Sequence, residues 1–340
     1  MDFNDMIRQP EYKFLMNNAN LGSNIMLLGV GGSHAYGTNG ENSDVDLRGI
    51  ATNTSRNILT GNDFEQVVET ETDTTIYSLD KIVKLLCSCN PNVIELLGLK
   101  PEHYIVLNDA GKELLSNKHL FLSKRAVNSF GGYANAQLRR LENKSARLVS
   151  QTQMEKHILK SIEHASVDFK RKFFAMPDDA ISLYVDRAEN PDLDSEIFMD
   201  ISLSHYPLRD YKGMMTTIGE IIKAYNKIGH RNASAISRDK LGKHMCHLVR
   251  LYLMCFDILE WGEIVTYREK EHDLLMDIRK GKYLDDNRQP ISMFYDMVDE
   301  YEKKLDYLKT HTDLPDEPDM DKVNDLLSGI NYSVVCGGRA

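Results

Sequence analysis

The feature that most constrains the fold is an apolar run that ends directly in glycines. Residues 24–30 (NIMLLGV) are followed at once by Gly31-Gly32-Ser33. A short apolar run bounded by turn-forming residues is typical of a buried strand. Glycines let the backbone turn sharply and approach a ligand closely, and a serine at this point can cap a helix. The sequence therefore predicts a strand, a tight glycine turn and a helix, in that order.

Strand patterns continue through the first third of the chain, and helical patterns dominate afterwards. β-branched and aromatic residues favour strands over residues 44–52, 63–69 and 71–77. From Leu79 onward the apolar residues recur with a helical period. Long helical patterns occupy residues 123–149, 151–173, 212–228, 238–261 and 290–309. The segment 177–195, rich in Asp and Pro, is expected to be a loop or a short helix.

This order of patterns predicts an α+β chain with two domains. A small α/β domain is expected over residues 1–115 and a mostly α-helical domain over residues 116–310, with a linker and tail over residues 311–340. We expect the active site in the cleft between the two domains.

Composition limits the class of protein. The N-terminus lacks the basic and apolar regions of a signal peptide, and no run approaches the roughly 18 apolar residues that cross a bilayer. The five cysteines form no CxxC pair, which argues against a disulfide framework or a zinc site. We therefore expect a soluble, cytoplasmic protein without a membrane partner, and the sequence sets no oligomeric state.

The net charge of −10 argues against a surface that coats nucleic acid as a whole. The charge is uneven, however, because residues 118–172 carry twelve Lys and Arg against four Asp and Glu, a local +8. Such a stretch permits binding of a phosphate-rich partner. A solvated helix surface explains it equally well.

Two carboxylates follow the glycine turn, because ten residues separate Ser33 from Asp44-Val45-Asp46. Alternate side chains of a strand share a face, so Asp44 and Asp46 are expected to point the same way. Adjacent carboxylates repel each other at neutral pH, and Mg²⁺ prefers such oxygen ligands together with substrate phosphates. Arg48 lies two residues after Asp46, so its side chain is expected on the same face of the strand. There it would either neutralise a phosphate or pair with Asp46.

A third carboxylate is expected from a neighbouring strand. Glu69, Glu71 and Asp73 alternate along it. We favour Asp73, which begins the sequence DTTIYSL where the strand leads into a helix, and Glu71 is the alternative. The glycine turn, through Gly32 and Ser33, would hold the phosphates of a nucleotide while the carboxylates hold the metal.

A later helix offers a second group of candidates. Lys243, His247 and Arg250 are spaced to share one face, which would bind the triphosphate or the acceptor. An ordinary amphipathic helix is the competing interpretation. Tyr36 either touches the nucleotide or packs the loop, and Glu95 is interpreted as bracing the end of the sheet.

Several motifs together resemble the DNA polymerase β-like nucleotidyltransferase superfamily, and more narrowly the RNA-repair-associated group of RlaP and YcgL-like proteins. The resemblance spans roughly residues 25–285. It is carried by GGSHAYGTNGENSDVDLRGI (31–50), DTTIYSLDKIVKLL (73–86), NPNVIEL (90–96), FLSK (121–124), GYANAQLRRL (132–141), KHMCHLVRLYLMCFDILEWGEI (243–264) and IRKGKY (278–283). Position 75 is Thr, where some relatives carry a further acidic residue.

The resemblance implies a small mixed β-sheet of the polymerase β-like type and an enzyme that moves an NMP from an NTP, ATP among the candidates, to an acceptor hydroxyl. Two Mg²⁺ or Mn²⁺ ions would be held by Asp44, Asp46 and Asp73, and RNA or tRNA would be the acceptor. Intact catalytic residues favour this interpretation over a nucleotide-binding regulatory or toxin–antitoxin partner with little catalysis.

Overall fold

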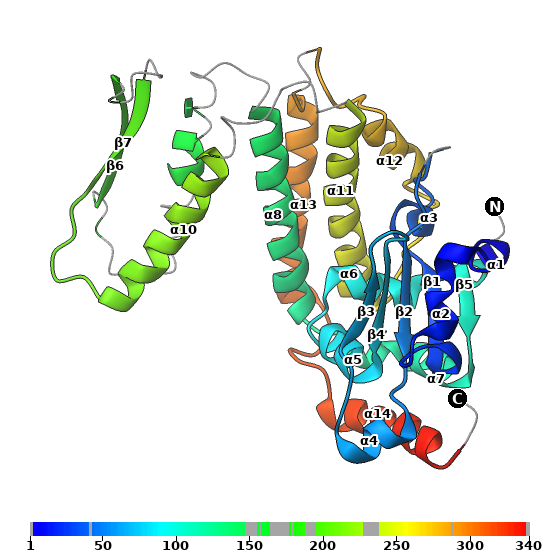
Figure 1. Cartoon of the computed structure of the whole chain (residues 1–340). Coiled ribbons are helices and arrows are strands. Elements are labelled where there is room, and N and C mark those ends of the chain that lie inside the picture. The colour runs from blue at the N-terminus through cyan, green and yellow to red at the C-terminus, as the bar shows by residue number, and fades with distance from the viewer. Residues whose placement is uncertain are drawn as a thin grey trace. The chain divides into compact units, whose positions relative to one another are not determined.

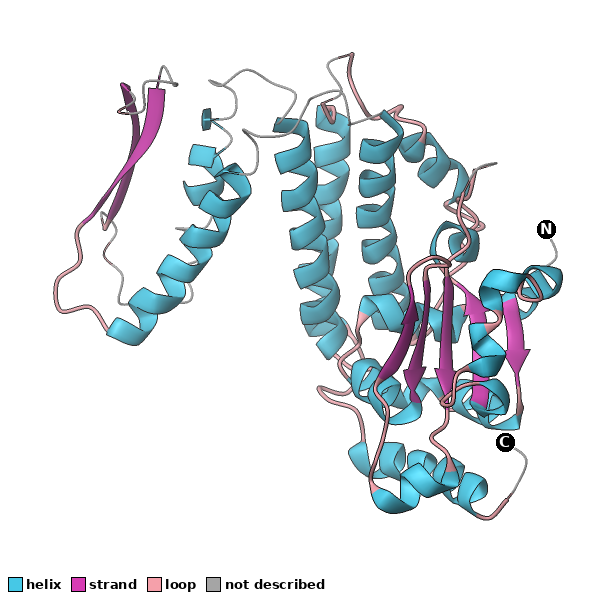
Figure 2. Ribbon diagram, viewed as in Figure 1, coloured by secondary structure: helices cyan, strands magenta, loops and turns pink. Residues whose placement is uncertain are grey.

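The computed structural model describes residues 3–40, 43–146, 155–156, 158–163, 177, 180–187, 189, 195–226, 238–286 and 289–337. The chain divides into two compact units. The first comprises Met1–Gln137, Lys243–Tyr283 and Ser292–Ala340, and the second comprises Leu138–Gly242 and Leu284–Ile291. Figure 1 and Figure 2 show the helices and strands of both. A mixed sheet accompanied by many helices confirms the predicted α+β class.

The first unit is built on a five-stranded sheet. The order across the sheet is β3 (Gln66–Glu69), β4 (Thr74–Ser78), β2 (Leu47–Ala51), β1 (Ile25–Val30) and β5 (Tyr104–Leu107). β2 and β4 run parallel, and the other neighbours are antiparallel. The strand predicted over residues 44–52 begins only at Leu47, so Asp44 and Asp46 precede it. β5 has no counterpart among the predicted strands.

Apolar side chains cover both faces of this sheet. On one face, residues of the N-terminal segment pack against the strands in a buried cluster: Tyr12, Leu15, Leu21, Ile25, Leu28, Leu47, Ala51 and Ile76. That segment contains α1 (Phe3–Met6), the 3-10 turn Pro10–Tyr12 and α2 (Phe14–Asn17). On the other face, Leu96 and Leu99 pack against Gly29, where a larger residue would overlap the Leu99 side chain. The sheet is therefore a buried layer that fixes the ends of its strands.

Short helices surround the strands of the first unit. They are α3 (Gly32–Tyr36), α4 (Ser55–Thr60), α5 (Leu79–Cys87), α6 (Pro91–Ile94), the 3-10 turn Glu95–Gly98 and α7 (Asp109–Ser116). Ser78 caps α5 by accepting from the Lys81 N–H, as expected for a serine at a helix N-terminus.

Long helices follow the predicted periodicity closely. The structure has α8 (Arg125–Ala146), α10 (Leu208–Asn226), α11 (Arg238–Trp261) and α13 (Ser292–His311), together with the shorter α12 (His272–Arg279). The expected tail contains α14 (Met320–Val335), which contacts α4 through the Ser55 hydroxyl and the Val334 carbonyl, 2.9 Å apart. Of the helix predicted over 151–173, residues 155–156 and 158–163 are helical, and the remainder lies outside the described residues.

The second unit contains a hairpin that the sequence does not lead us to expect. β6 (Ile181–Arg187) pairs antiparallel with β7 (Ser195–Ile201), whereas residues 177–195 are predicted as a loop or short helix. Most of the Asp and Pro residues of this segment lie before or after β6 in the sequence, and Ile181 and Leu183 alternate with polar residues inside β6. Ala180 packs with Met214 and Ile218 of α10 in a small buried cluster. No helix among the described residues is long and apolar enough to cross a membrane.

Candidate active site

The glycine turn lies directly against one of the predicted carboxylates. β1 ends at Val30, and α3 begins at Gly32 with Gly31 at its N-cap position. Gly32 has φ +57°, and a Cβ at this position would overlap the Asp46 carboxylate. Glycine is therefore required at position 32 both by backbone conformation and by space. Ser33 lies inside α3 and does not act as its cap.

The parallel pairing of β2 and β4 brings two carboxylates to the same end of the sheet. Leu47 pairs with Thr74, and the Leu47 N–H donates to the Asp73 carbonyl over 3.3 Å. Asp46 and Asp73 each stand one residue before this pair. The Gly31 N–H donates to the Asp46 carbonyl over 2.7 Å, which ties the acidic segment to the glycine turn. Backbone hydrogen bonds thus set Asp46 and Asp73 side by side.

The electrostatics of Asp46 reflect this crowding. Burial, followed by the hydrogen bond and the charge of Asp73, raises the pKa of Asp46 to about 6. Arg48 lowers this pKa and Glu95 raises it further. A partly buried carboxylate with a second carboxylate in contact favours a bound cation, because one positive charge relieves both.

Arg48 holds Asp73 rather than Asp46. Its Nη1 donates to the Asp73 carbonyl over 2.6 Å, and its Nη2 pairs with Asp73 Oδ1 at 3.2 Å. Asp73 has φ +42°, a left-handed conformation that is strained by roughly 1–3 kcal/mol for a residue with a side chain. The Arg48 contacts help to maintain this conformation at the site.

Two other predicted carboxylates are placed differently. Asp44 is exposed and precedes β2, and Glu71 is exposed in the turn between β3 and β4. Asp73, the favoured third carboxylate, is the one in hydrogen-bonding contact with Asp46. Within the described parts of the chain, no three His, Cys, Asp or Glu side chains are grouped so that they could hold a metal ion. The described pair, Asp46 and Asp73, is the centre of the site.

A polar network lies next to this pair. The Tyr36 hydroxyl donates to Glu95 Oε2 over 2.6 Å, and the Arg250 guanidinium lies 3.5 Å from the centre of the Tyr36 ring. Arg250 Nη2 is 2.9 Å from His247 Nδ1. Burial raises the pKa of Glu95, while Arg250, the Tyr36 hydroxyl and Arg48 lower it. Of the predicted helix-face residues, Arg250 and His247 therefore belong to this network.

The remaining residue of that face, Lys243, is exposed one turn before His247. Of the two interpretations of Tyr36, its burial favours packing, because its hydroxyl contacts Glu95 and its ring contacts Arg250 of α11. Glu95 braces the sheet end, as predicted, through its carboxylate on Tyr36 and its carbonyl, which accepts from the Thr266 hydroxyl over 2.6 Å.

Comparison with known proteins identifies a similar family. Residues 7–173 match the model of RlaP, the RNA repair pathway DNA polymerase beta family. This segment is similar to the RlaP family. The chain is also 24% identical over 282 residues to an uncharacterized 38.9 kDa protein in the nrdC-mobD intergenic region of Enterobacteria phage T4, an alignment that covers 74% of this chain and 81% of the phage protein. No solved structure matches the chain.

The RlaP segment contains every predicted carboxylate and the glycine turn, but part of the site lies beyond it. Arg279, on α12, contacts the loop that joins α3 to Asp44. The backbone N–H of Arg268 is 3.4 Å from the Tyr36 carbonyl, and its guanidinium pairs with Asp257 at 2.6 Å. The sequence gives no signal for the contacts of Arg279 and of the Arg268 N–H with the loop, because each spans more than 200 residues.

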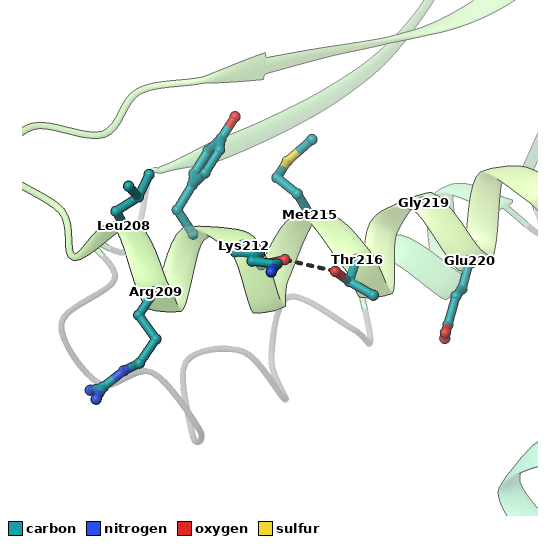
Figure 3. Close-up of a pocket in the computed structure, with 8 residues that line it drawn as sticks. Leu208, Arg209, Lys212, Met215, Thr216, Gly219 and Glu220 are labelled. Carbon is teal, nitrogen blue, oxygen red and sulfur yellow. Dashed lines mark hydrogen bonds between the residues drawn. The ribbon is translucent and has the colours of Figure 1, made fainter.

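The described residues of the second unit, which continues beyond the RlaP segment, include a hollow of about 920 Å³ along α10. Its described lining consists of residues of this one helix: Leu208, Arg209, Tyr211, Lys212, Met215, Thr216, Gly219 and Glu220. Figure 3 shows these side chains following the helix, with the Thr216 hydroxyl bonded to the Lys212 carbonyl. They include no paired carboxylates, so we assign the chemistry to Asp46 and Asp73.

Proposed function

We propose that this protein is a metal-dependent nucleotidyltransferase that moves an NMP from an NTP to an acceptor hydroxyl. The observation that carries the proposal is the carboxylate pair of Asp46 and Asp73, placed at the same end of two parallel strands and against Gly32. The match of residues 7–173 to the RNA repair pathway DNA polymerase beta family supports it.

The donor set fits a divalent cation. Mg²⁺ in nucleotide enzymes is commonly held by one or two carboxylates together with substrate phosphates and waters. Asp46 and Asp73 supply such a pair, and the burial and the Asp73 carboxylate that raise the pKa of Asp46 are conditions that a bound cation would offset. Asp44 would be the third ligand. Two Mg²⁺ or Mn²⁺ ions bound here would stabilise negative charge on the attacking and leaving oxygens.

The surrounding residues have separate tasks in this proposal. Gly32 leaves room for the Asp46 carboxylate, and Ser33 on the adjacent helix turn would donate to a phosphate oxygen. Arg48 keeps Asp73 in its left-handed conformation through two contacts. Lys243, on the exposed surface of α11, would meet the triphosphate.

Arg250 and His247 support the site through α3, the helix that follows the glycine turn. The Arg250 guanidinium stacks on Tyr36, the last residue of α3, and His247 contacts the same guanidinium. We therefore assign them to positive potential and to the placement of α3, rather than to direct phosphate contact. An RNA end or a tRNA is the acceptor class that the family description favours.

A label-transfer assay tests the proposal. The protein is incubated with each of the four α-labelled NTPs, with Mg²⁺ or Mn²⁺, and with separate pools of total RNA, tRNA and protein. We expect label in an RNA pool, reduced at least about 100-fold by Asp46→Asn or Asp73→Asn, since each removes a metal ligand.

Glu71→Gln is the matched control, because Glu71 is an exposed acidic residue two positions from Asp73. It should transfer label at the wild-type rate. Loss of transfer in Glu71→Gln but not in Asp73→Asn would overturn the assignment of the third carboxylate. Metal-dependent NTP binding without transfer to any pool would instead identify a nucleotide-binding regulatory partner.

A further inference from the structure

The loop between α3 and Asp44 is held by Arg279, which lies more than 230 residues away in the sequence. Arg279 is the last residue of α12 and is 9% exposed. Its Nη1 donates to the Thr38 carbonyl, and its Nη2 donates to the Ser43 hydroxyl over 3.1 Å. One guanidinium therefore contacts residues on both sides of the loop that leads to Asp44.

Ser43 is the point at which the loop contacts converge. Its hydroxyl accepts from the Gly40 N–H over 2.9 Å as well as from Arg279, and its own N–H donates to the Gly40 carbonyl over 3.1 Å. Its carbonyl is 3.2 Å from His34 Nε2. Because Ser43 directly precedes Asp44, these contacts determine where the Asp-Val-Asp segment begins.

Neighbouring residues from the same distant segment hold the start of the loop. The Tyr267 ring packs against Gly37, which has φ +72°, so closely that a Cβ at this position would overlap it. The Arg268 N–H reaches the Tyr36 carbonyl. Together, Tyr267, Arg268 and Arg279 contact Gly37, Tyr36, Thr38 and Ser43, which lie at the end of α3 and on either side of the loop.

The chemistry of arginine suits this arrangement. A guanidinium presents several donors in a rigid planar fork, so it can hold two acceptors at a fixed separation. A buried cation strongly favours keeping its hydrogen bonds, because losing them leaves the charge without compensation. The hydrogen bonds of Arg279 described here are to neutral oxygens of Thr38 and Ser43, so they fix the positions of these two residues. The charge of the guanidinium also adds positive potential beside the acidic segment.

We propose that Arg279 is a positioning residue for the acidic segment, which holds Thr38 and Ser43 and so places Asp44 and Asp46. The inference rests on the proposed function for its catalytic consequence. Arg279 lies outside residues 7–173, so the site is completed by a part of the chain beyond the matched family segment.

Two measurements on the full-length protein test this role. Hydrogen–deuterium exchange reports on the Thr38 and Gly40 amides, which donate to the Ser33 carbonyl and the Ser43 hydroxyl. Mn²⁺ titration, followed by the paramagnetic relaxation of water, reports on the carboxylates. In Arg279→Gln we expect loop exchange to become about 10-fold faster and Mn²⁺ binding about 10-fold weaker, as for loss of a charge-assisted hydrogen bond.

Arg279→Lys should recover part of both losses, because a lysine can reach one acceptor but not hold two in a fixed fork. Lys280→Gln is the matched control, since Lys280 is the exposed neighbour, and it should change neither measurement. Exchange in β1 should stay slow in every variant, which separates loop release from unfolding. If Arg279→Gln does not fold, Ser43→Ala removes the same contact from the loop side.

The outcomes are distinct. Unchanged loop exchange in Arg279→Gln, with β1 still protected, would overturn the positioning role. Unchanged or tighter Mn²⁺ binding would also overturn it, because removal of the positive charge alone favours binding of a cation. Faster loop exchange in a protein whose wild type neither binds Mn²⁺ nor transfers label would support the role of Arg279 in the loop while rejecting the proposed function.

Discussion

Replacing Asp46 by Asn should stabilise the metal-free protein at neutral pH while abolishing nucleotide transfer. Burial, then the contact and charge of Asp73, raises the pKa of Asp46 from 3.8 to about 6. A carboxyl group with a raised pKa binds its proton more tightly in the folded state, so its ionised form opposes folding at neutral pH. Asparagine has nearly the same shape without the charge, and the substitution removes this opposition.

The magnitude follows from the pKa. One pKa unit corresponds to about 1.36 kcal/mol, so a rise from 3.8 to about 6 is at most about 3 kcal/mol. Asp46 is only partly buried, and solvent screening reduces this to an expected gain of about 1.5 kcal/mol. For a domain of this size, such a gain raises Tm by about 3–6 °C.

The pH dependence has a definite sign. Between about pH 4 and pH 6 the folded protein keeps the Asp46 proton that the unfolded chain has released, so wild-type stability falls as the pH rises through this window. The advantage of Asp46→Asn over wild type should therefore be complete at pH 7.5, about half as large at pH 5, about a fifth as large at pH 4, and absent below about pH 3.

Urea unfolding in EDTA at these pH values measures the difference in the free energy of unfolding. Asp44→Asn is the matched control, because the Asp44 carboxylate is exposed and its replacement should change stability by less than about 0.5 kcal/mol. An Asp46→Asn protein that is less stable than wild type at pH 7.5, or whose advantage is the same at pH 5, would refute the reasoning.

Three further predictions concern the same site. Gly32→Ala should abolish transfer and destabilise the protein by about 1–3 kcal/mol or more in thermal unfolding. Its backbone has a positive φ, and its new Cβ would overlap the Asp46 carboxylate. Gly61→Ala is the control, because Gly61 has a similar φ but open space around it, and it should lose only about 1 kcal/mol. Tyr36→Phe should cost about 1–3 kcal/mol in urea unfolding, because Glu95 Oε2 loses its donor; an unchanged midpoint would contradict this. Mn²⁺ at 100 times its Kd should stabilise wild type by about 2.7 kcal/mol, EDTA should reverse this, and Asp46→Asn should not respond.

Local patterns predicted the parts of the fold that depend on local interactions. The strand before the glycine turn and the helices α8, α10, α11 and α13 follow from apolar periodicity, because burial of one face decides their structure. β2 begins at Leu47 because Leu47 pairs with Thr74 of β4. The periodicity of the sequence does not reveal this pairing. β6 is not expected from the sequence, because the Asp and Pro residues of this segment favour a loop and the alternation within the strand is short.

The candidate site divides in the same way. Gly32 and the two aspartates of the Asp-Val-Asp segment stand out in the sequence because their residue types suit close approach and metal binding. The contact between Asp46 and Asp73 needs the parallel pairing of β2 and β4. Arg279 could not be found from the sequence, since its partners lie more than 230 residues away and one is a backbone carbonyl.

The division of the first unit into three stretches of chain has a consequence for biosynthesis. About 100 residues, Leu138–Gly242, are translated between the sheet and α11. At roughly 5–20 residues per second, the ribosome needs about 5–20 seconds to make them. During that time the nascent chain carries Asp46 and Asp73 but lacks Arg250, Arg268 and Arg279. We therefore expect Thr38 and Ser43, on either side of the loop before Asp44, to remain without their Arg279 contacts until translation passes α12.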